Sequence, residues 1–217
     1  MTDFAARRTI MVDTQVRPSD VTKYPIIDAM LTVPRERYVP ENLREAAYIG
    51  ENLDLGGGRV MLEPRTLSKM LDALDIQPDE LVLDIGSAQG YSAAVIACLA
   101  EAVVAVEDDE ARASDAEETL AAEGVDNVAV VNAPLVEGAP QHGPYDVMIV
   151  QGAVETFPQS LMAQLKDGGR VTCLFMEGAL GVVRLGYRSG DEMDWRRLFN
   201  ASAPVLEGFA RPPAFTF

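Results

Sequence analysis

The sequence predicts an α/β fold built on a doubly wound, mostly parallel sheet. From Pro64 onward, short apolar stretches typical of buried strands alternate with amphipathic helical stretches, a pattern that produces parallel strands joined by helices. The segment LVLDIGSAQGYSAAVIA, residues 81–97, connects one such strand to one such helix through a glycine-containing turn. A turn signal at 189–191 separates two extended stretches near the end of the chain, which predicts an antiparallel hairpin at one edge of the sheet.

The individual elements follow from apolar periodicity and from the residues that start and stop helices. In the stretch from Pro64, the side chains of Leu67, Met70, Leu71 and Leu74 share one helical face, and proline suits the first turn. Helices are expected at residues 24–31, 40–49, 64–76, 91–100, 110–124 and 158–169. Strands are expected at residues 81–85, 102–108, 127–132, 145–150 and 170–176.

The first 63 residues lack this regular alternation of strands and helices and end near a glycine-rich loop, LGGGR, at 55–59. Consecutive glycines permit unusual backbone angles and close approach of a ligand. The sequence therefore divides into a small helical N-terminal extension with its glycine loop, residues 1–63, and a main domain, residues 64–217. We expect the extension to lie on the substrate side.

Composition and charge exclude several classes of protein. Acidic residues outnumber basic ones by 34 to 18, a net charge of −16, which disfavours binding to nucleic acid. The sequence has no apolar run long enough to span a membrane, and the charged stretch at residues 1–20 predicts no secretory signal. The two cysteines, Cys98 and Cys173, lie in apolar surroundings and are expected to be buried, reduced thiols of a cytoplasmic protein. A single histidine, His142, in a loop predicts no metal site.

The turn after the first strand of the main domain indicates the type of ligand. Ligands of doubly wound sheets bind at the carboxyl ends of the strands, where Gly86 and Gly90 allow close backbone approach. The spacing is not the G-x-G-x-x-G of dinucleotide sites. S-adenosylmethionine has no phosphate and tolerates the looser turn. Asp84 at the strand end suits its ammonium group, and Glu107, 21 residues beyond Gly86 at the end of the next strand, suits its ribose hydroxyls.

Three long segments resemble the protein-L-isoaspartate O-methyltransferase family. Residues 29–48, AMLTVPRERYVPENLREAAY, resemble its V-P-R-E-x-[FY]-V-P segment, and residues 81–97 resemble its V-L-E-I-G-T-G-S-G-Y-Q-A-A-V-L-A. Residues 144–171, from PYDVMIV to KDGGRV, resemble a third segment that ends in Q-L-K-P-G-G-R-L. The resemblance covers about residues 15–171. It implies a class I methyltransferase fold of the Rossmann-like type and S-adenosylmethionine as the cofactor, with S-adenosylhomocysteine as the product.

The resemblance also implies a set of cofactor-binding residues and a substrate class. The substrate would be a carboxylate of an isoaspartyl or similar residue in a damaged protein or peptide, so that the reaction serves protein repair. The expected cofactor-binding residues are Asp84, Ile85, Gly86, Gln89, Gly90, Tyr91, Glu107, Asp108, Asn132, Pro134 and Gln151.

Two positions depart from the family pattern. The family carries an active-site hydroxyl in T-I-S-Q-P, where this chain reads VMLEP and has Leu62 at the hydroxyl position. The family's Gly-Asp-Gly after the third strand, next to the adenosine, corresponds to Ala-Pro-Leu at 133–135 in this chain. The neighbouring Asn132 is a candidate to replace the lost polar contact with the cofactor. Arg59 and Arg65 flank the altered segment and are candidates to grip an acceptor carboxylate, because guanidinium binds carboxylate with two hydrogen bonds.

Methylation of a carboxylate needs no general base, because a carboxylate is already ionised at neutral pH. The absence of a catalytic His or Lys cluster therefore fits this chemistry better than methylation of an amine or phenol. The sequence leaves two alternatives open, both favoured by Leu62 and Pro134. One is a methyltransferase that acts on another acceptor, and the other is a non-catalytic protein that binds S-adenosylmethionine or S-adenosylhomocysteine. The oligomeric state is not predicted.

Overall fold

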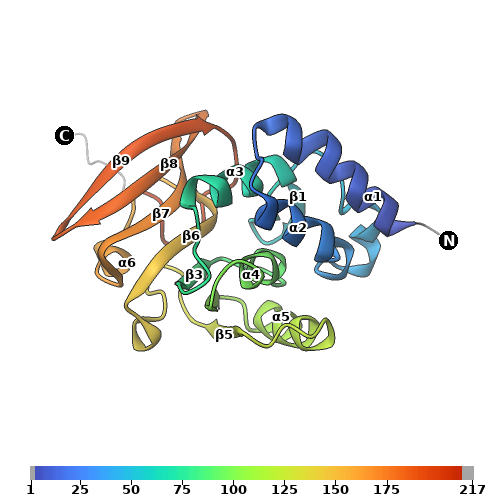
Figure 1. The fold of residues 1–217 in the computed structure, drawn as a ribbon. Helices are drawn as coiled ribbons and strands as arrows, with labels where there is room; N and C mark the ends of the chain where they lie inside the picture. Colours follow the sequence, from blue (N-terminus) through green and yellow to red (C-terminus); the bar gives the residue numbers. More distant parts are fainter. Residues whose placement is uncertain (1–2, 212–217) are drawn as a thin grey trace.

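A computed structural model describes residues 3–211 of the chain and has a seven-stranded sheet at its centre (Figure 1). The strands of this sheet are β3 (Leu81–Ile85), β4 (Ala102–Glu107), β5 (Val128–Asn132), β6 (Tyr145–Val154), β7 (Leu165–Glu177), β8 (Leu180–Ser189) and β9 (Glu192–Asn200). The α-helices are α1 (Phe4–Met11), α2 (Tyr24–Thr32), α3 (Pro64–Leu74), α4 (Tyr91–Ala97), α5 (Glu110–Ala122) and α6 (Gln159–Met162). A separate two-stranded hairpin consists of β1 (Leu53–Gly56) and β2 (Arg59–Met61).

The order of the strands places a topological switch point in the middle of the sheet. The order is β5-β4-β3-β6-β7-β8-β9. The strands from β5 to β7 are parallel, while β8 pairs antiparallel with both β7 and β9. From β3 the chain adds β4 and β5 on one side, and then β6 and β7 on the other side of β3, so that the switch point lies between β3 and β6. In such sheets the crevice at this switch point is where ligands bind.

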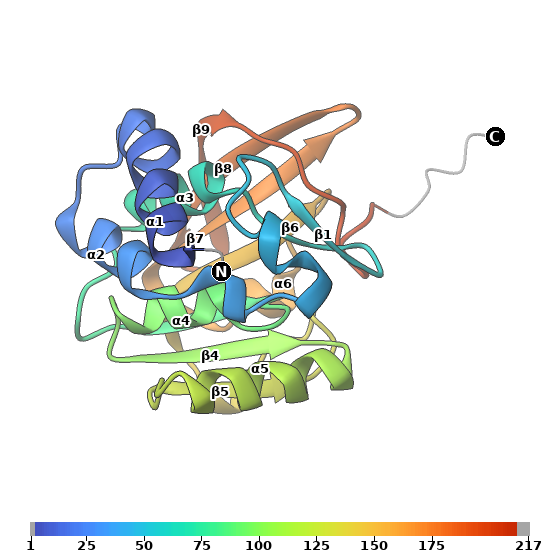
Figure 2. The same cartoon turned by 90° about the vertical axis from the view of Figure 1, so that its right-hand side faces the viewer.

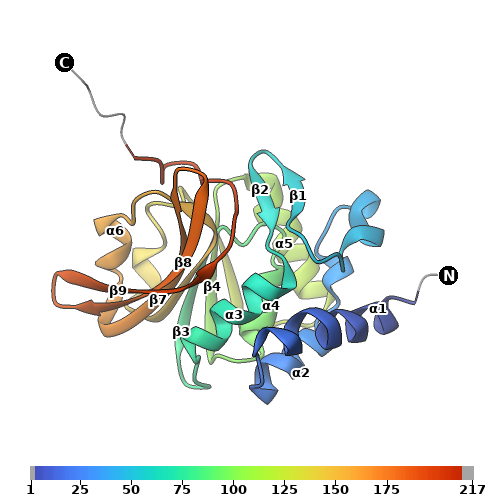
Figure 3. The same cartoon turned by 90° about the horizontal axis from the view of Figure 1, so that it is seen from above.

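The two faces of the sheet are covered unequally. Helices α3, α4 and α5 cover one face, where Leu67, Ala93 and Leu120 belong to a single apolar core. On the other face, the short α6 and the segment around Phe209 pack against Leu83 and Val106. Figure 3 shows α6 on the opposite side of the sheet from α3, α4 and α5. The prediction of a doubly wound sheet with an antiparallel C-terminal edge is thus confirmed.

The N-terminal segment packs against helices α3 and α4 on one face of the sheet (Figure 2). Buried Met11 and Met30 belong to the same apolar core as Leu67 of α3 and Ala93 of α4. The predicted extension 1–63 therefore shares a core with the main domain.

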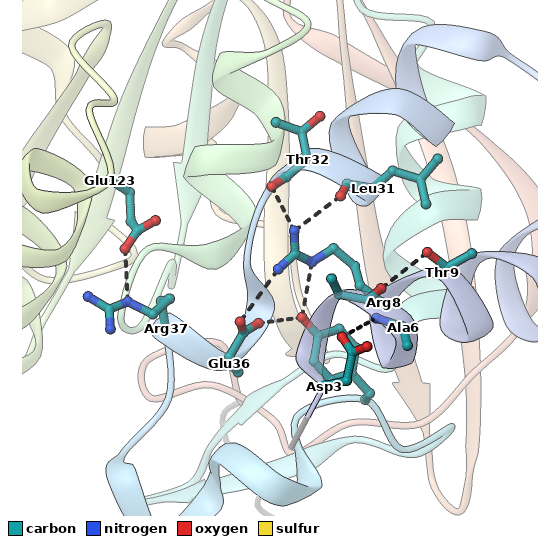
Figure 4. A network of polar contacts seen from close by, with 11 residues as sticks. Asp3, Ala6, Arg8, Thr9, Leu31, Thr32, Glu36, Arg37 and Glu123 are labelled. Atoms are coloured by element: carbon teal, nitrogen blue, oxygen red, sulfur yellow. Dashed lines mark hydrogen bonds and ion pairs between the residues drawn. The ribbon is translucent and has the colours of Figure 1, made fainter. Parts of the chain in front are cut away.

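Polar contacts fix the N-terminal segment in place (Figure 4). The Arg8 side chain of α1 donates hydrogen bonds to the backbone carbonyls of Leu31 and Thr32 at 3.2 and 3.1 Å and pairs with Glu36 at 3.4 Å. Arg37 donates from Nε to Glu123 at 2.8 Å, which links this segment to the end of α5.

Several predicted elements differ in type or length from those observed. The helix expected at 40–49 is a 3-10 helix, Glu41–Ala46. The helix expected at 158–169 is wrong in length, because α6 ends at Met162 and Leu165 already pairs with Tyr145 of β6. A left-handed Gly168 (φ 78°) then lies inside β7. Helix α1, the π-helical turn Val12–Val16 and the β1–β2 hairpin were not predicted.

Candidate functional site

The turn between β3 and α4 is held against the end of β4 by backbone hydrogen bonds. Gly86 adopts a left-handed conformation with φ of 77°, which favours glycine, and its N–H donates to the Val106 carbonyl at 2.8 Å. The Ala88 N–H donates to Oε2 of Glu107 at 2.8 Å. The predicted glycine turn and the predicted acid at the end of β4 therefore lie side by side.

Glu107 is fully buried, and a basic side chain already binds its carboxylate. Arg59, from the β1–β2 hairpin, donates from Nη2 to Oε2 of Glu107 at 2.5 Å. Arg59 is only 5% exposed. Burial raises the pKa of the Glu107 carboxyl, and the Arg59 guanidinium opposes that rise. The structure thus pairs Arg59 with Glu107 and does not leave it free for an acceptor carboxylate.

Arg59 lines one of two cavities at the ends of the strands, and its guanidinium lies over Gly86, which lines the other. The small cavity, of about 20 Å³, is lined by Gly86, Leu62 and Gln151 among others and has room for about one water molecule. The open cavity, of about 820 Å³, is lined by Arg59 and Asp108 among others. An ideal Cβ built on Gly86 would approach Nη1 of Arg59 to 2.9 Å.

The larger cavity contains several of the predicted cofactor-binding residues. Asp108 follows β4, while Asn132 and Pro134 lie at and after the end of β5, and all three line this cavity. Asn132 also donates from Nδ2 to the Glu107 carbonyl at 3.0 Å. The volume lies within the usual range for small-molecule pockets, about 300–1,000 Å³.

These features fit S-adenosylmethionine. Gly86 itself has no side chain to obstruct the cleft, and Glu107, which is covered by Arg59 and lines neither cavity, supplies a carboxylate at the end of the neighbouring strand. The hydroxyl of Ser87 is buried without a hydrogen-bond partner and lines the small cavity. A ligand that spans both cavities would meet Asp108, Asn132 and Pro134 at one end and Ser87 and Gln151 at the other.

Comparison with known proteins identifies the family. A family model described as "Protein-L-isoaspartate(D-aspartate) O-methyltransferase" matches residues 7–180. The chain belongs to this family. It is 37% identical over 209 residues to Protein-L-isoaspartate O-methyltransferase 1 of Rhodopseudomonas palustris (strain HaA2), covering 95% of this chain and 85% of the relative. A Methylorubrum extorquens (strain PA1) relative named protein-L-isoaspartate O-methyltransferase is 35% identical over 208 residues, covering 95% of this chain and 91% of the relative.

Solved structures confirm the class I methyltransferase fold of the family. A structure titled protein-L-isoaspartate O-methyltransferase superposes with a TM-score of 0.80 and 22% identity, covering 95% of this chain and 66% of the other. A Plasmodium falciparum protein of the same description, in complex with S-adenosyl-L-homocysteine, superposes with a TM-score of 0.79 and 17% identity. That comparison covers 95% of this chain and 99% of the other. The protein-L-isoaspartate O-methyltransferase family uses S-adenosylmethionine, and this chain is a methyltransferase of that type.

Asp84 lies beneath the turn and does not line either cavity. It is 0% exposed and accepts hydrogen bonds from Oγ of Ser92 at 2.6 Å and from Nε2 of Gln151 at 2.8 Å. Ser92 and Gln151 do line the small cavity. The direct contact of Asp84 with the ligand's ammonium group stays a prediction, and in this structure Asp84 hydrogen-bonds two cavity-lining side chains.

Burial raises the pKa of Asp84 to about 6, against the opposing hydrogen bonds of Ser92 and Gln151. Since the folded-state pKa lies above the unfolded value, the stabilising contribution of the neutral carboxyl is complete below about pH 4. It is lost as pH rises through about 6.

We predict that Asp84→Asn removes this component of the pH dependence of stability. Asparagine accepts from Gln151 through Oδ1 and donates to the Ser92 hydroxyl through Nδ2, so that the hydrogen bonds persist without the charge. The free energy of unfolding of the variant relative to the parent, measured by urea denaturation from pH 4 to 7, should rise by about 2 kcal/mol. A difference that does not change with pH would contradict the raised pKa.

Four predicted cofactor residues have other surroundings. Ile85 is buried in the apolar core of the α6 face, because alternate residues of a strand point to opposite faces. Gly90 packs against α5, where a Cβ would lie 3.3 Å from Leu120. Gln89 lines a separate groove over α5, and Tyr91 stacks edge-on against Tyr38, with only part of its surface at the small cavity.

The predicted substrate side is apolar. Leu62 is 3% exposed and lines the small cavity together with Val60 and Met61, opposite Gly86. Arg65 lies outside both cavities, with its guanidinium 5.6 Å from the ring centre of Phe199. Arg65 is therefore placed away from the expected acceptor site.

Sequence analysis missed three side chains that shape the site. Arg35, buried beneath the N-terminal segment, donates from Nη2 to the Leu62 carbonyl at 2.8 Å and lies over the Tyr91 ring at 4.7 Å. Arg112 of α5 donates to the Gly56 carbonyl at 2.9 Å. Ser92 was detectable from its place in the first turn of the predicted helix, and Arg35 from its place in the V-P-R-E segment of residues 29–48. Nothing local in the sequence marks Arg112.

Within residues 3–211, no group of three or more His, Cys, Asp or Glu side chains is arranged to hold a metal ion. No helix in this described part is long and apolar enough to cross a membrane.

Proposed function

We propose that this chain transfers the methyl group of S-adenosylmethionine to the free α-carboxylate of an isoaspartyl residue in damaged proteins or peptides. Family membership supports the reaction. The observation that carries the assignment to these residues is the contact between the Gly86 turn and Glu107 at the adjoining ends of β3 and β4. Residues 1–63 form the substrate side of the cleft in this proposal, and residues 64–217 hold the cofactor.

Each side chain at the cleft has a defined part in this reaction. When bound, S-adenosylmethionine supplies an electrophilic methyl group, and an acceptor carboxylate oxygen displaces the sulfur to give a methyl ester and S-adenosylhomocysteine. Glu107 accepts the ribose hydroxyls, while Asp108, Asn132 and Pro134 enclose the adenosine end. Ser92 and Gln151 face the amino-acid end, oriented by Asp84. The apolar wall that contains Leu62 excludes water from the methyl group.

The reaction is tested by transfer of labelled methyl groups to an isoaspartyl peptide, with the same peptide containing normal aspartate as the control. Base-labile methyl ester on the isoaspartyl peptide alone would support the proposal. Cofactor binding without transfer to either peptide would contradict isoaspartyl methylation. The apolar Val60-Met61-Leu62 wall would then favour a less polar acceptor.

We also propose a cytoplasmic location, supported by the free thiols of Cys98 and Cys173. Cys173 is buried as expected, whereas the expectation of a buried Cys98 is wrong, because its side chain is exposed at the end of α4.

We predict that Leu62→Ser raises isoaspartyl methylation about tenfold above that of Leu62→Ala. Both substitutions remove the same buried bulk and should destabilise the fold by about 2–5 kcal/mol, so the comparison isolates the hydroxyl. One hydrogen bond to the acceptor is worth roughly 1–3 kcal/mol, which corresponds to about tenfold or more in rate. Initial rates are measured at a temperature where both variants are folded. Equal rates would show that a hydroxyl at this position has no part in the reaction.

A further inference from the structure

The described structure presents the cofactor cleft in a closed form, because the side chain of Arg59 covers the proposed ribose acceptor, Glu107. The Arg59 guanidinium binds Oε2 of Glu107 at 2.5 Å and lies 3.8 Å from Oδ1 of Asp108. It also covers the backbone of Gly86, since an ideal Cβ on that residue would lie 2.9 and 3.2 Å from its two terminal nitrogens. One side chain therefore covers both features on which ribose binding would depend.

The Oε2 oxygen of Glu107 has no acceptor position left for a ligand in this form. Oε2 accepts from both Arg59 and the Ala88 N–H. Oε1 lies 3.4 Å from the Asp109 nitrogen, within hydrogen-bond distance, and 3.9 Å from Nη1 of Arg112. Two ribose hydroxyls need free acceptor positions and open space in front of them. A ribose on Glu107 and the guanidinium of Arg59 thus exclude one another.

The β1–β2 hairpin that carries Arg59 is docked at its tip by a second arginine. Nη2 of Arg112 donates to the Gly56 carbonyl at 2.9 Å and lies 2.7 Å from an ideal Cβ on Gly57. Gly56, Gly57 and Gly58 all have positive φ angles. Arginines from β2 and α5 therefore converge near Glu107 and hold the hairpin over the cleft.

The closed form also contains an unsatisfied polar group. Nε of Arg59 is buried and has no hydrogen-bond partner. A buried donor without a partner destabilises the state that contains it. Water can satisfy this N–H once the side chain leaves the cleft, which lowers the free-energy difference between the closed and open forms.

We propose that the β1–β2 hairpin is an autoinhibitory latch, in which Arg59 occupies the ribose acceptor Glu107 and must leave before S-adenosylmethionine or S-adenosylhomocysteine binds. This inference rests on the proposed role of Glu107 in cofactor binding. The latch makes the apparent cofactor affinity equal to the intrinsic affinity multiplied by the fraction of open molecules. An open form populated to 10% or less therefore weakens binding by at least about tenfold.

Calorimetric titration with S-adenosylhomocysteine tests the latch. Arg59→Met removes the guanidinium and keeps an unbranched stem, and it should bind at least about tenfold more tightly than the parent. Arg65→Met removes the same charge outside both cavities and should bind like the parent. Arg112→Gln leaves Arg59 intact and releases the hairpin tip, so it should bind more tightly than the parent by a smaller factor. It also provides a test if Arg59→Met does not fold, which thermal unfolding shows.

The outcomes separate the latch from the proposed function. If the parent binds S-adenosylhomocysteine and Arg59→Met binds it equally or more weakly, the latch is overturned and the cofactor assignment stays intact. The same comparison with Arg112→Gln decides the case in which Arg59→Met does not fold. If neither the parent nor any of the folded variants binds S-adenosylhomocysteine, the cofactor assignment itself is overturned, and the latch with it. An equal gain in Arg65→Met would show that net charge controls affinity, which would also overturn the latch.

Discussion

Gly86→Ala is expected to reduce cofactor affinity at least a hundredfold while the protein still folds. Gly86 has a φ of 77°, so alanine there adds a strain of roughly 1–2 kcal/mol. Its Cβ would also project to within 2.9 Å of Nη1 of Arg59, into the space in front of Glu107. A ligand that uses Glu107 would meet this methyl group in either position of the Arg59 side chain. Titration with S-adenosylhomocysteine measures the loss.

Gly124→Ala is the matched control for this substitution. Gly124 has a similar φ of 73°, and an ideal Cβ there has no heavy atom within 4 Å. The two variants should therefore lose similar free energies of unfolding, while only the substitution at Gly86 should lose binding. If Gly86→Ala bound S-adenosylhomocysteine as well as Gly124→Ala, the turn would have only a structural role.

The central sheet could be predicted from the sequence because its strands are signalled locally. Each parallel strand is a short apolar run bounded by turn or helix signals, and β3 to β6 were found within a few residues of their observed ends. The error at 158–169 has a different origin. The stretch there has a helical pattern, but residues from Leu165 gain a backbone partner in β6, and pairing with a distant strand overrides local helix preference.

The candidate site was predictable where it depends on strand ends and unpredictable where it depends on long-range pairing. Gly86 and Glu107 lie together because β3 and β4 are adjacent parallel strands, which the element order implies. The ion pair between Arg59 and Glu107 joins residues 48 positions apart. It depends on how a hairpin of glycines and apolar residues docks over the sheet, and no periodicity in the sequence contains that information.

Glu107→Gln is expected to destabilise the protein by about 3–5 kcal/mol, because it leaves the buried Arg59 guanidinium without its principal counter-charge. Glutamine retains an oxygen that can accept from the Ala88 N–H, so the turn keeps its backbone contact. Among the described ion pairs of Arg59, the acid that remains is Asp108, whose Oδ1 lies 3.8 Å from Nη2 of Arg59. The loss is measured as the change in free energy of unfolding in urea.

The double variant Glu107→Gln/Arg59→Met separates the effect on stability from the effect on binding. Replacement of both members of a buried ion pair by uncharged groups is often neutral or stabilising, so the double variant should recover most of the stability that Glu107→Gln loses. It should not recover binding. Its affinity for S-adenosylhomocysteine should be at least about tenfold below that of Arg59→Met, which keeps the carboxylate, because a hydrogen bond to a charged group contributes about 1.5–3 kcal/mol. Equal affinity of the double variant and Arg59→Met would show that Glu107 is a partner of Arg59 alone, and the ribose acceptor would have to lie elsewhere in the cleft.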